Sequence, residues 1–192
     1  MPATALPTPL LQHVQGSTRS INLPLNQDNR ELYLLKELYG YDSFQVGQLE
    51  AIQSILQDKD TLVLIPTGGG KSLIYTMAAV LKQGLTIIIE PLKFIMEEQA
   101  EKLRQEQVPA FLTHNSSLTD TEMEYVVNAL CRQDLPFAIL FTSPECIVSS
   151  KLLNILRKWN DAGNLNFIAV DEAHCIDIWG PDSGQITLKW VY

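Results

Sequence analysis

The residues of this chain best suited to chemistry lie at positions 67–72, where TGGGKS follows an apolar, strand-like run at 62–65. Glycines let backbone N–H groups approach phosphate oxygens, and a helix that begins after them directs its positive end at the same anion. The alternative is a glycine-rich turn that happens to precede Lys-Ser. A strand-like run before the loop and a helix-forming segment after it favour a nucleotide-phosphate site. The residues assigned to this phosphate loop are Thr67, Gly68, Gly69, Gly70, Lys71 and Ser72.

Two side chains of the phosphate loop have specific expected roles. Lys71 would reach the β- and γ-phosphates, and the Ser72 hydroxyl would bind Mg²⁺. The strict form of the motif has a glycine six residues before the lysine, where this chain has Ile65. The loop therefore matches only the shorter form.

A pair of carboxylates stands about a hundred residues downstream, where Asp171 and Glu172 end a second apolar run at 166–170. Asp171 would hold Mg²⁺ through its water shell, and Glu172 would orient and polarise an attacking water. An Asp-Glu pair after a strand can instead be a helix N-cap pair. The catalytic interpretation is favoured because the pair lies downstream of a phosphate loop in an alternating strand–helix pattern. The expected catalytic residues are Glu172, Lys71 and Asp171.

Composition restricts the class of protein. The 192 residues suffice for one domain, and 46% apolar content suits a globular core. No apolar run approaches the roughly 20 residues of a membrane span, and residues 1–24 show no secretory signal. Cys131, Cys146 and Cys175 are widely spaced, which is typical of reduced intracellular thiols. We expect an intracellular protein, in the nucleus if the source is eukaryotic.

The net charge of −8, from 14 basic and 22 acidic residues, argues against a dedicated nucleic-acid-coating domain. It does not exclude a motor domain that holds one strand by a few backbone contacts. Any nucleic-acid binding by this chain alone is expected to be weak.

Strand-like runs alternate with helical periods along the chain, which predicts an α/β fold with a parallel sheet covered by helices on both faces. The helix at 48–57 should turn Leu49, Ile52 and Leu56 inward. The predicted strands span 61–65, 86–90, 110–113, 137–142 and 166–170; the predicted helices span 30–39, 48–57, 71–82, 149–159 and stretches after Leu92 and Thr119.

Three segments are expected. Residues 1–25 contain four prolines and no regular period, which predicts a disordered tail. Residues 26–182 should form the nucleotide-binding domain. Residues 183–192 form a divergent tail, in which apolar and other residues alternate as in a strand.

The phosphate loop and the DEAH sequence at 171–174 together resemble the first motor domain of RecQ-type DNA helicases, in the DEAH-bearing part of superfamily 2. The resemblance runs from about residue 34 to 182. It implies a RecA-like P-loop NTPase domain, ATP and Mg²⁺ as cofactors, and descent from an ATP-dependent 3′-to-5′ DNA helicase. An unrelated P-loop kinase or GTPase is disfavoured, because it accounts neither for Gln48 nor for DEAH.

Residues 38–52 resemble the adenine-recognition motif of the same family. Tyr41 would stack on the base, and the Gln48 amide would contact adenine N6 and N7 together. A helix start with an aromatic staple would explain Phe44 and Leu49 but not Gln48. The family usually has an arginine where this chain has Gln45.

The segment from Ala173 to Asp182 resembles the family's aromatic-rich loop, which couples DNA binding to hydrolysis. His174 would relay the nucleotide state, and Trp179 would belong to the DNA sensor. Single-stranded or partly duplex DNA is therefore the expected partner, held weakly by this chain alone; protein partners are unknown. Glu90 stands where the family tends to have a small hydroxyl, and residues 183–185 replace an expected Phe-Arg-Pro.

Two functions remain open at this stage. One is the ATP-binding half of a helicase, and the other is a RecQ-derived module that binds ATP or a protein partner without driving anything. The resemblance stops at Asp182, before the second motor domain and its arginine finger. A truncated or mispredicted gene product, or a splice form, would explain that loss.

Overall fold

The computed structural model describes residues 30–66, 68–82, 84–106, 108, 110–113, 137–147, 150–172 and 190–191. Several predictions from sequence lie outside these residues. They are the tail at 1–25, Thr67, the helix after Thr119, and the coupling residues His174 and Trp179.

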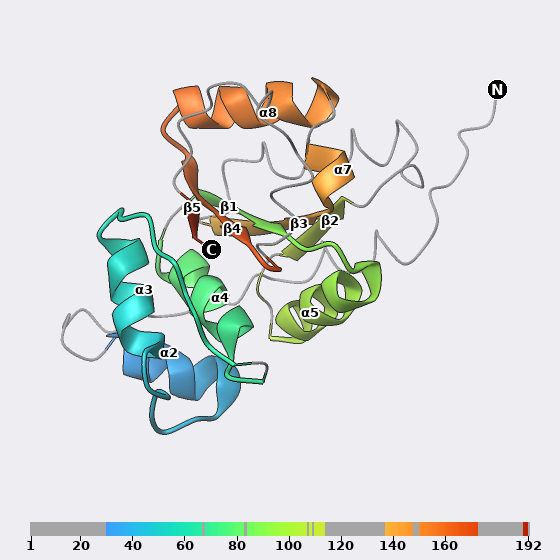
Figure 1. Ribbon diagram of the computed structural model, residues 1–192. Helices are drawn as coiled ribbons and strands as arrows, with labels where there is room; N and C mark the ends of the chain where they lie inside the picture. The colour runs from blue at the N-terminus through green and yellow to red at the C-terminus, as the bar shows by residue number, and fades with distance from the viewer. Residues whose placement is uncertain are drawn as a thin grey trace.

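Among the described residues, five parallel strands form one sheet in the order β2-β3-β1-β4-β5 (Figure 1). Ile89, the last residue of β1, lies beside Thr142 of β3 and Val170 of β4. Glu90 and Asp171, which follow these strands, therefore leave the sheet at the same edge, where open α/β sheets bind ligands. The bounds are β1 Gly84–Ile89, β2 Ala110–Thr113, β3 Phe137–Thr142, β4 Leu165–Val170 and β5 Trp190–Val191.

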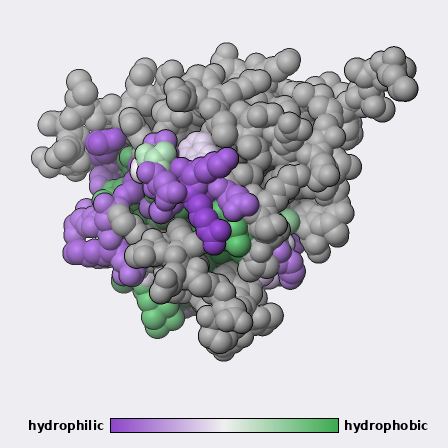
Figure 2. Space-filling model, turned by 90° about the horizontal axis from the view of Figure 1, so that it is seen from above, coloured by the Kyte–Doolittle hydropathy of each residue, from purple (hydrophilic) through white to green (hydrophobic). Residues whose placement is uncertain are grey.

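Helices cover both faces of the sheet, as predicted. In Figure 1, α7 and α8 lie above the sheet, α4 and α5 lie below it, and α2 and α3 pack against α4. Seen from above in Figure 2, the described surface over α8 is mainly hydrophilic, in agreement with the exposed Asn154, Arg157 and Lys158. The bounds are α2 Arg30–Tyr39, α3 Gln48–Leu56, α4 Lys71–Leu81, α5 Lys93–Gln105, α7 Pro144–Ile147 and α8 Ser150–Asp161.

Helix α4 is the centre of the core. Every residue from Leu73 to Val80 is buried, because the sheet covers one side of the helix and α2 and α3 cover the other. A helix that is apolar all round is expected in such a position. The helix that carries the phosphate loop at its start is thus held from two sides.

Most predicted elements are confirmed. The strands β2 and β3 have the predicted bounds, and α5 buries the three residues at its inner positions, Met96, Ala100 and Leu103. Gly40 ends α2 with φ of 69° and donates its N–H to the Lys36 carbonyl at 2.9 Å. In the C-terminal segment, β5 pairs with β4 at Ile168 and Trp190, so strand structure is confirmed there for two residues.

The predicted strand at 61–65 is wrong. Thr61 forms one isolated bridge, and residues 62–66 have no regular structure. The exposed fraction is 64% for Leu62 and 84% for Leu64, whereas Val63 and Ile65 pack against the core. An apolar run becomes a buried strand only if a neighbouring strand pairs with it. The position beside β4 belongs to β5, and 62–65 pairs with none of the five described strands.

The predicted inner face of α3 is also corrected. The buried residues are Gln48, Ala51, Ile52 and Ile55, while Leu49 and Leu56 are half-buried. The buried stripe includes Gln48 because both polar atoms of its amide are hydrogen-bonded inside the protein. The strands β1 and β4 begin two residues and one residue earlier than predicted, and the short helix α7 was not predicted.

Among the residues with a described placement, no helix is long and apolar enough to cross a membrane.

Candidate nucleotide-binding site

The phosphate loop has, at two positions, a backbone conformation that strongly favours glycine. Gly68 and Gly70 have φ of 81° and 77°, in the left-handed region. A Cβ on Gly69 would lie 2.1 Å from Ile65 Cγ2, and a Cβ on Gly70 would lie 2.5 Å from Gln48 Nε2. The chain therefore passes closely over its neighbours at Gly69 and Gly70, whereas a Cβ on Gly68 would have no atom within 4 Å.

Lys71 and Ser72 form the first turn of α4, immediately after Gly70. Among the described residues, no side chain caps this helix start, so the first backbone N–H groups, which point back toward the glycines, have no side-chain acceptor. The positive end of the helix dipole adds to the charge of Lys71. This arrangement fits an anion with several oxygens, such as a nucleotide phosphate.

Asp171 is fixed by three hydrogen bonds at the carboxyl end of β4. Its backbone N–H donates to the Ile89 carbonyl at 2.9 Å, and its Oδ1 accepts the Glu172 N–H at 3.0 Å. Its Oδ2 accepts the Tyr75 hydroxyl at 3.2 Å. Since Tyr75 is on the face of α4 that also carries Ser72, three residues earlier, the predicted metal ligands are brought to one side of the helix.

Glu172 follows with φ of 56°, a left-handed backbone that is uncommon for a residue with a side chain. Its side chain is exposed. Such conformations persist where the surroundings enforce them, and they cluster at functional sites. The turn carries Glu172 away from the sheet at the edge where Asp171 stands.

Glu90 is a third carboxylate at this edge, with an exposed fraction of 2%. Its Oε1 accepts the Leu92 N–H at 2.9 Å. The pKa of Glu90 is raised to about 7, chiefly by burial and further by the negative charges of Asp171 and Glu172, against the lowering effect of the Leu92 hydrogen bond. In the sequence, Glu90 stands out only as a departure from the family pattern.

Gln48, predicted to recognise adenine, contacts the phosphate loop in this structure. Its Oε1 accepts the Gln45 N–H at 2.9 Å, and its Nε2 donates to the Gly69 carbonyl at 3.2 Å. The side chain thus connects the start of α3 to the phosphate loop. Tyr41, the predicted stacking residue, is 55% exposed and lies parallel to Tyr39, with ring centroids 6.3 Å apart.

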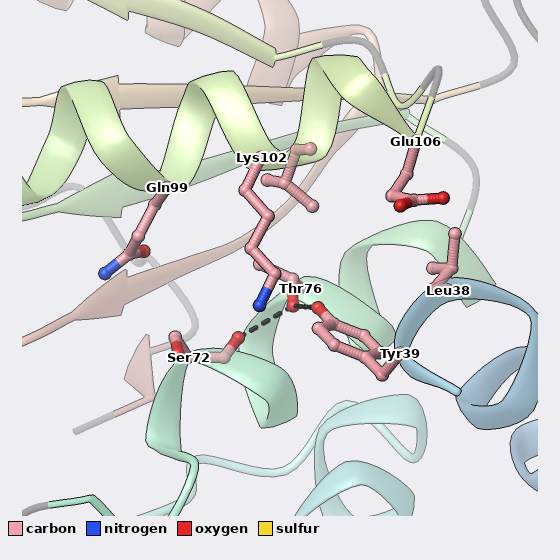
Figure 3. Close-up of a pocket in the computed structure, with 8 residues that line it drawn as sticks. Leu38, Tyr39, Ser72, Thr76, Gln99, Lys102 and Glu106 are labelled. Carbon is pink, nitrogen blue, oxygen red and sulfur yellow. Dashed lines mark hydrogen bonds between the residues drawn. The ribbon is translucent and has the colours of Figure 1, made fainter. Parts of the chain in front are cut away.

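A small hollow of about 50 Å³ opens between α2, α4 and α5 and reaches Ser72 (Figure 3). The Tyr39 hydroxyl bonds to Thr76 Oγ1, which in turn donates to the Ser72 carbonyl at 2.7 Å. The Lys102 ammonium lies 5.6 Å from the centre of the Tyr39 ring, a cation–π distance. The lining residues are Leu38, Tyr39, Ser72, Thr76, Gln99, Lys102, Leu103 and Glu106.

Sequence reasoning missed Tyr75 and Gln99. The spacing of three residues from Ser72 could have indicated Tyr75, because it places both on one helix face. Gln99 could not have been found in this way, because its contact with Tyr75 depends on how α5 packs beside α4.

The donor set fits Mg²⁺ bound together with a nucleotide. No group of three or more His, Cys, Asp or Glu side chains among the described residues could hold a metal by itself. Mg²⁺ in nucleotide sites is held by one or two protein oxygens, phosphates and waters. One carboxylate at Asp171, one hydroxyl at Ser72 and an open glycine loop match that requirement.

Comparison with known proteins identifies the family of this chain. Residues 45–189 match the model of the DEAD/DEAH box helicase family. The chain is 40% identical over 146 residues to the ATP-dependent DNA helicase RecQ of Synechocystis, which covers 76% of this chain and 30% of that protein. It is 34% identical over 168 residues to ATP-dependent DNA helicase Q5 of rat, covering 86% of this chain and 17% of the relative. The chain thus spans less than a third of either relative.

Among solved structures, the helicase domain of Pyrococcus furiosus Hef resembles this fold with a TM-score of 0.51 at 19% sequence identity, over 77% of this chain and 32% of that one. This likeness supports the RecA-like α/β fold predicted from sequence. The family model covers most of the chain, including the phosphate loop and the Asp171-Glu172 pair. The chain belongs to the DEAD/DEAH box helicase family, as a RecQ-like motor domain.

Proposed function

We propose that this chain is the ATP-binding motor domain of a RecQ-like 3′-to-5′ DNA helicase that acts on single-stranded or partly duplex DNA, inside the cell and in the nucleus if the source is eukaryotic. The observation that carries the proposal is the meeting of two distant segments. The phosphate loop and Asp171 are about a hundred residues apart, yet Tyr75 on α4 joins them through a 3.2 Å hydrogen bond.

Magnesium-bound ATP would supply the phosphoryl group that is transferred to water. The Lys71 ammonium and the backbone N–H groups of 68–70 would bind and orient the phosphates. The Gly69 N–H donates to the Pro66 carbonyl at 2.9 Å, so it would have to exchange that partner. Ser72 and Asp171 would hold the metal, the latter through its water shell. Glu172 would position the attacking water and accept its proton. The loop glycines keep their side free for the phosphates because they carry no side chains.

Base recognition would use Gln48 and Tyr41. Both polar atoms of the Gln48 amide bond to the chain itself, so contact with adenine N6 and N7 would require exchange of those partners. Release of the Gly69 carbonyl by Gln48 would then alter the phosphate loop. The half-exposed Tyr41 ring offers a face on which a base can stack. His174 and Trp179 would couple this site to DNA.

A second candidate is a module that binds ATP but turns it over poorly. It is favoured by the positions of two described arginines. Arg157 lies exposed on α8, on the face of the sheet opposite α4, and Arg104 Nε donates to the Ala110 carbonyl at 2.9 Å. Neither faces the phosphate loop. An arginine finger can supply a factor of about 10³ to 10⁵ in rate.

Steady-state phosphate release with and without a thymidine oligonucleotide separates these candidates. We expect the 192-residue chain to release phosphate barely above background, and a fusion to the second motor domain of an intact RecQ protein to respond to DNA. Glu172→Gln in the fusion should abolish that response. A fusion whose phosphate release does not respond to DNA would contradict the helicase assignment. DNA-stimulated turnover by the chain alone would rule out the second candidate, a module that binds ATP but turns it over poorly.

A further inference from the structure

The hydroxyl of Tyr75 has two acceptors and one proton. It lies 2.9 Å from Gln99 Oε1 and 3.2 Å from Asp171 Oδ2. The Tyr75 side chain is buried, and this burial, together with the charge of Asp171, holds its pKa well above the ordinary value of 10. The hydroxyl therefore stays protonated at neutral pH, and its proton is divided between an amide oxygen and a carboxylate oxygen.

Tyr75 gives Asp171 its one side-chain hydrogen bond among the described side chains. The other carboxylate oxygen, Oδ1, accepts a backbone N–H from the neighbouring Glu172. With both bonds made, rotation of the carboxylate about its Cβ–Cγ bond is restrained, and one lone pair on each oxygen remains for metal-bound water. Without Tyr75, only the local bond to Glu172 N–H would restrain it.

Gln99 brings the competing acceptor from a different element. It projects from α5 on the side that faces α4 (Figure 3). Helix α5 begins at Lys93, directly after the Glu90–Leu92 segment, and its first turn exposes Phe94 beside the exposed Leu92. A displacement of α5 would change the distance from Gln99 to Tyr75, and so the share of the proton that reaches Asp171.

We propose that Tyr75 is a positioning residue for the metal-binding carboxylate of Asp171, and that Gln99 on α5 regulates it by competing for the same hydroxyl proton. The inference rests on the proposed function, in which Asp171 holds Mg²⁺. Groups that hydrogen-bond to a metal ligand commonly change metal affinity by about 10- to 100-fold when removed. Removal of Tyr75 and removal of Gln99 should therefore have opposite effects on Mg²⁺ binding.

The test is a titration of Mg²⁺ into the complex of the chain with a fluorescent ADP, together with ADP binding in EDTA. Tyr75→Phe keeps the ring and deletes the hydroxyl, so Mg²⁺ should bind about tenfold more weakly while ADP affinity in EDTA stays unchanged. Gln99→Met deletes the competing acceptor, so Mg²⁺ should bind about two- to threefold more tightly. Urea unfolding of both variants controls for stability.

Each possible result of these titrations supports or contradicts a stated part of the proposal. Unchanged Mg²⁺ affinity in Tyr75→Phe, or equal weakening with and without Mg²⁺, would overturn the positioning role. Weaker Mg²⁺ binding in Gln99→Met would overturn the competition, and this second variant keeps the test valid if Tyr75→Phe fails to fold. Wild-type protein that binds no ADP, or binds it without regard to Mg²⁺, would instead overturn the proposed function itself.

Discussion

The two sides of the α4 start differ in how their polar groups are satisfied. On the Gln48 side, a neutral amide bonds twice to the backbone of the chain itself, at Gln45 and Gly69. On the Asp171 side, carboxylates gather at the end of the sheet, and neither Glu90 nor Asp171 forms an ion pair within the described part of the chain. On the first side, the polar atoms of the Gln48 amide are hydrogen-bonded without a ligand. The second concentrates negative charge that a divalent cation would neutralise.

The largest effect should come from neutralising the charged side. Glu90→Gln keeps an acceptor for the Leu92 N–H and removes the charge. Between the ordinary pKa of 4.5 and the folded-state value of about 7, the folded protein binds more protons than the unfolded one, so stability falls as pH rises through this window. The variant should therefore gain roughly 2 kcal/mol more over wild type at pH 8 than at pH 5.

Urea unfolding at the two pH values measures this gain. Glu98→Gln removes an exposed carboxylate on the following helix, α5, and so controls for the loss of a negative charge that is not buried. A gain in Glu90→Gln that is equal at pH 5 and pH 8 would mean that Glu90 is not a strained carboxylate at this edge.

An effect of at most similar size should come from crowding the neutral side. Gly70→Ala forces a positive φ on alanine and places a Cβ 2.5 Å from Gln48 Nε2. Gly47→Ala is a matched control, because it has φ of 85° and no atom within 4 Å of the added Cβ. We expect about 1 kcal/mol of destabilisation for Gly47→Ala and roughly 2 kcal/mol for Gly70→Ala.

The difference between the two alanine variants measures the contact between Gln48 and the loop. Adding Gln48→Ala to each should remove that difference. If Gly70→Ala costs no more than Gly47→Ala in urea unfolding, the amide does not constrain the phosphate loop and the comparison of the two sides fails.

The smallest effect concerns base choice. Gln48 would exchange two hydrogen bonds to the chain for two to adenine, so its net preference for ATP over GTP should be only about 1 kcal/mol. Competition of ATP and GTP against a fluorescent ATP analogue measures it, and Gln48→Ala should abolish it. Equal displacement by GTP and ATP in the wild type would show that Gln48 does not recognise the base.

Prediction from sequence succeeded where a local pattern determines the structure. The inward spacing of Met96, Ala100 and Leu103 defined α5, and the apolar run at 137–142 defined β3. The apolar run at 62–65 has the same local pattern, but whether it forms a strand depends on which segment pairs with β4. A single sequence does not specify that choice.

In the candidate site, too, some features followed from local sequence patterns and others depend on contacts between elements. Lys71, Ser72 and Asp171 followed from motif spacing, and their elements lie where the pattern predicted. The bond from Gln48 to Gly69, the burial of Glu90 and the bridge from Gln99 to Tyr75 depend on contacts between separate elements. These are properties of packing, which residue types and spacing do not reveal.

The most direct test of the nucleotide site is a calorimetric titration of Mg·ADP into wild-type protein, Lys71→Ala and Lys158→Ala. Lys158 is exposed on α8, on the opposite face of the sheet, and controls for the loss of one positive charge. Lys71→Ala should bind at least tenfold more weakly, about 1.4 kcal/mol, while Lys158→Ala matches the wild type. Equal affinity in wild type and Lys71→Ala would contradict the assignment of residues 67–72 as a phosphate loop.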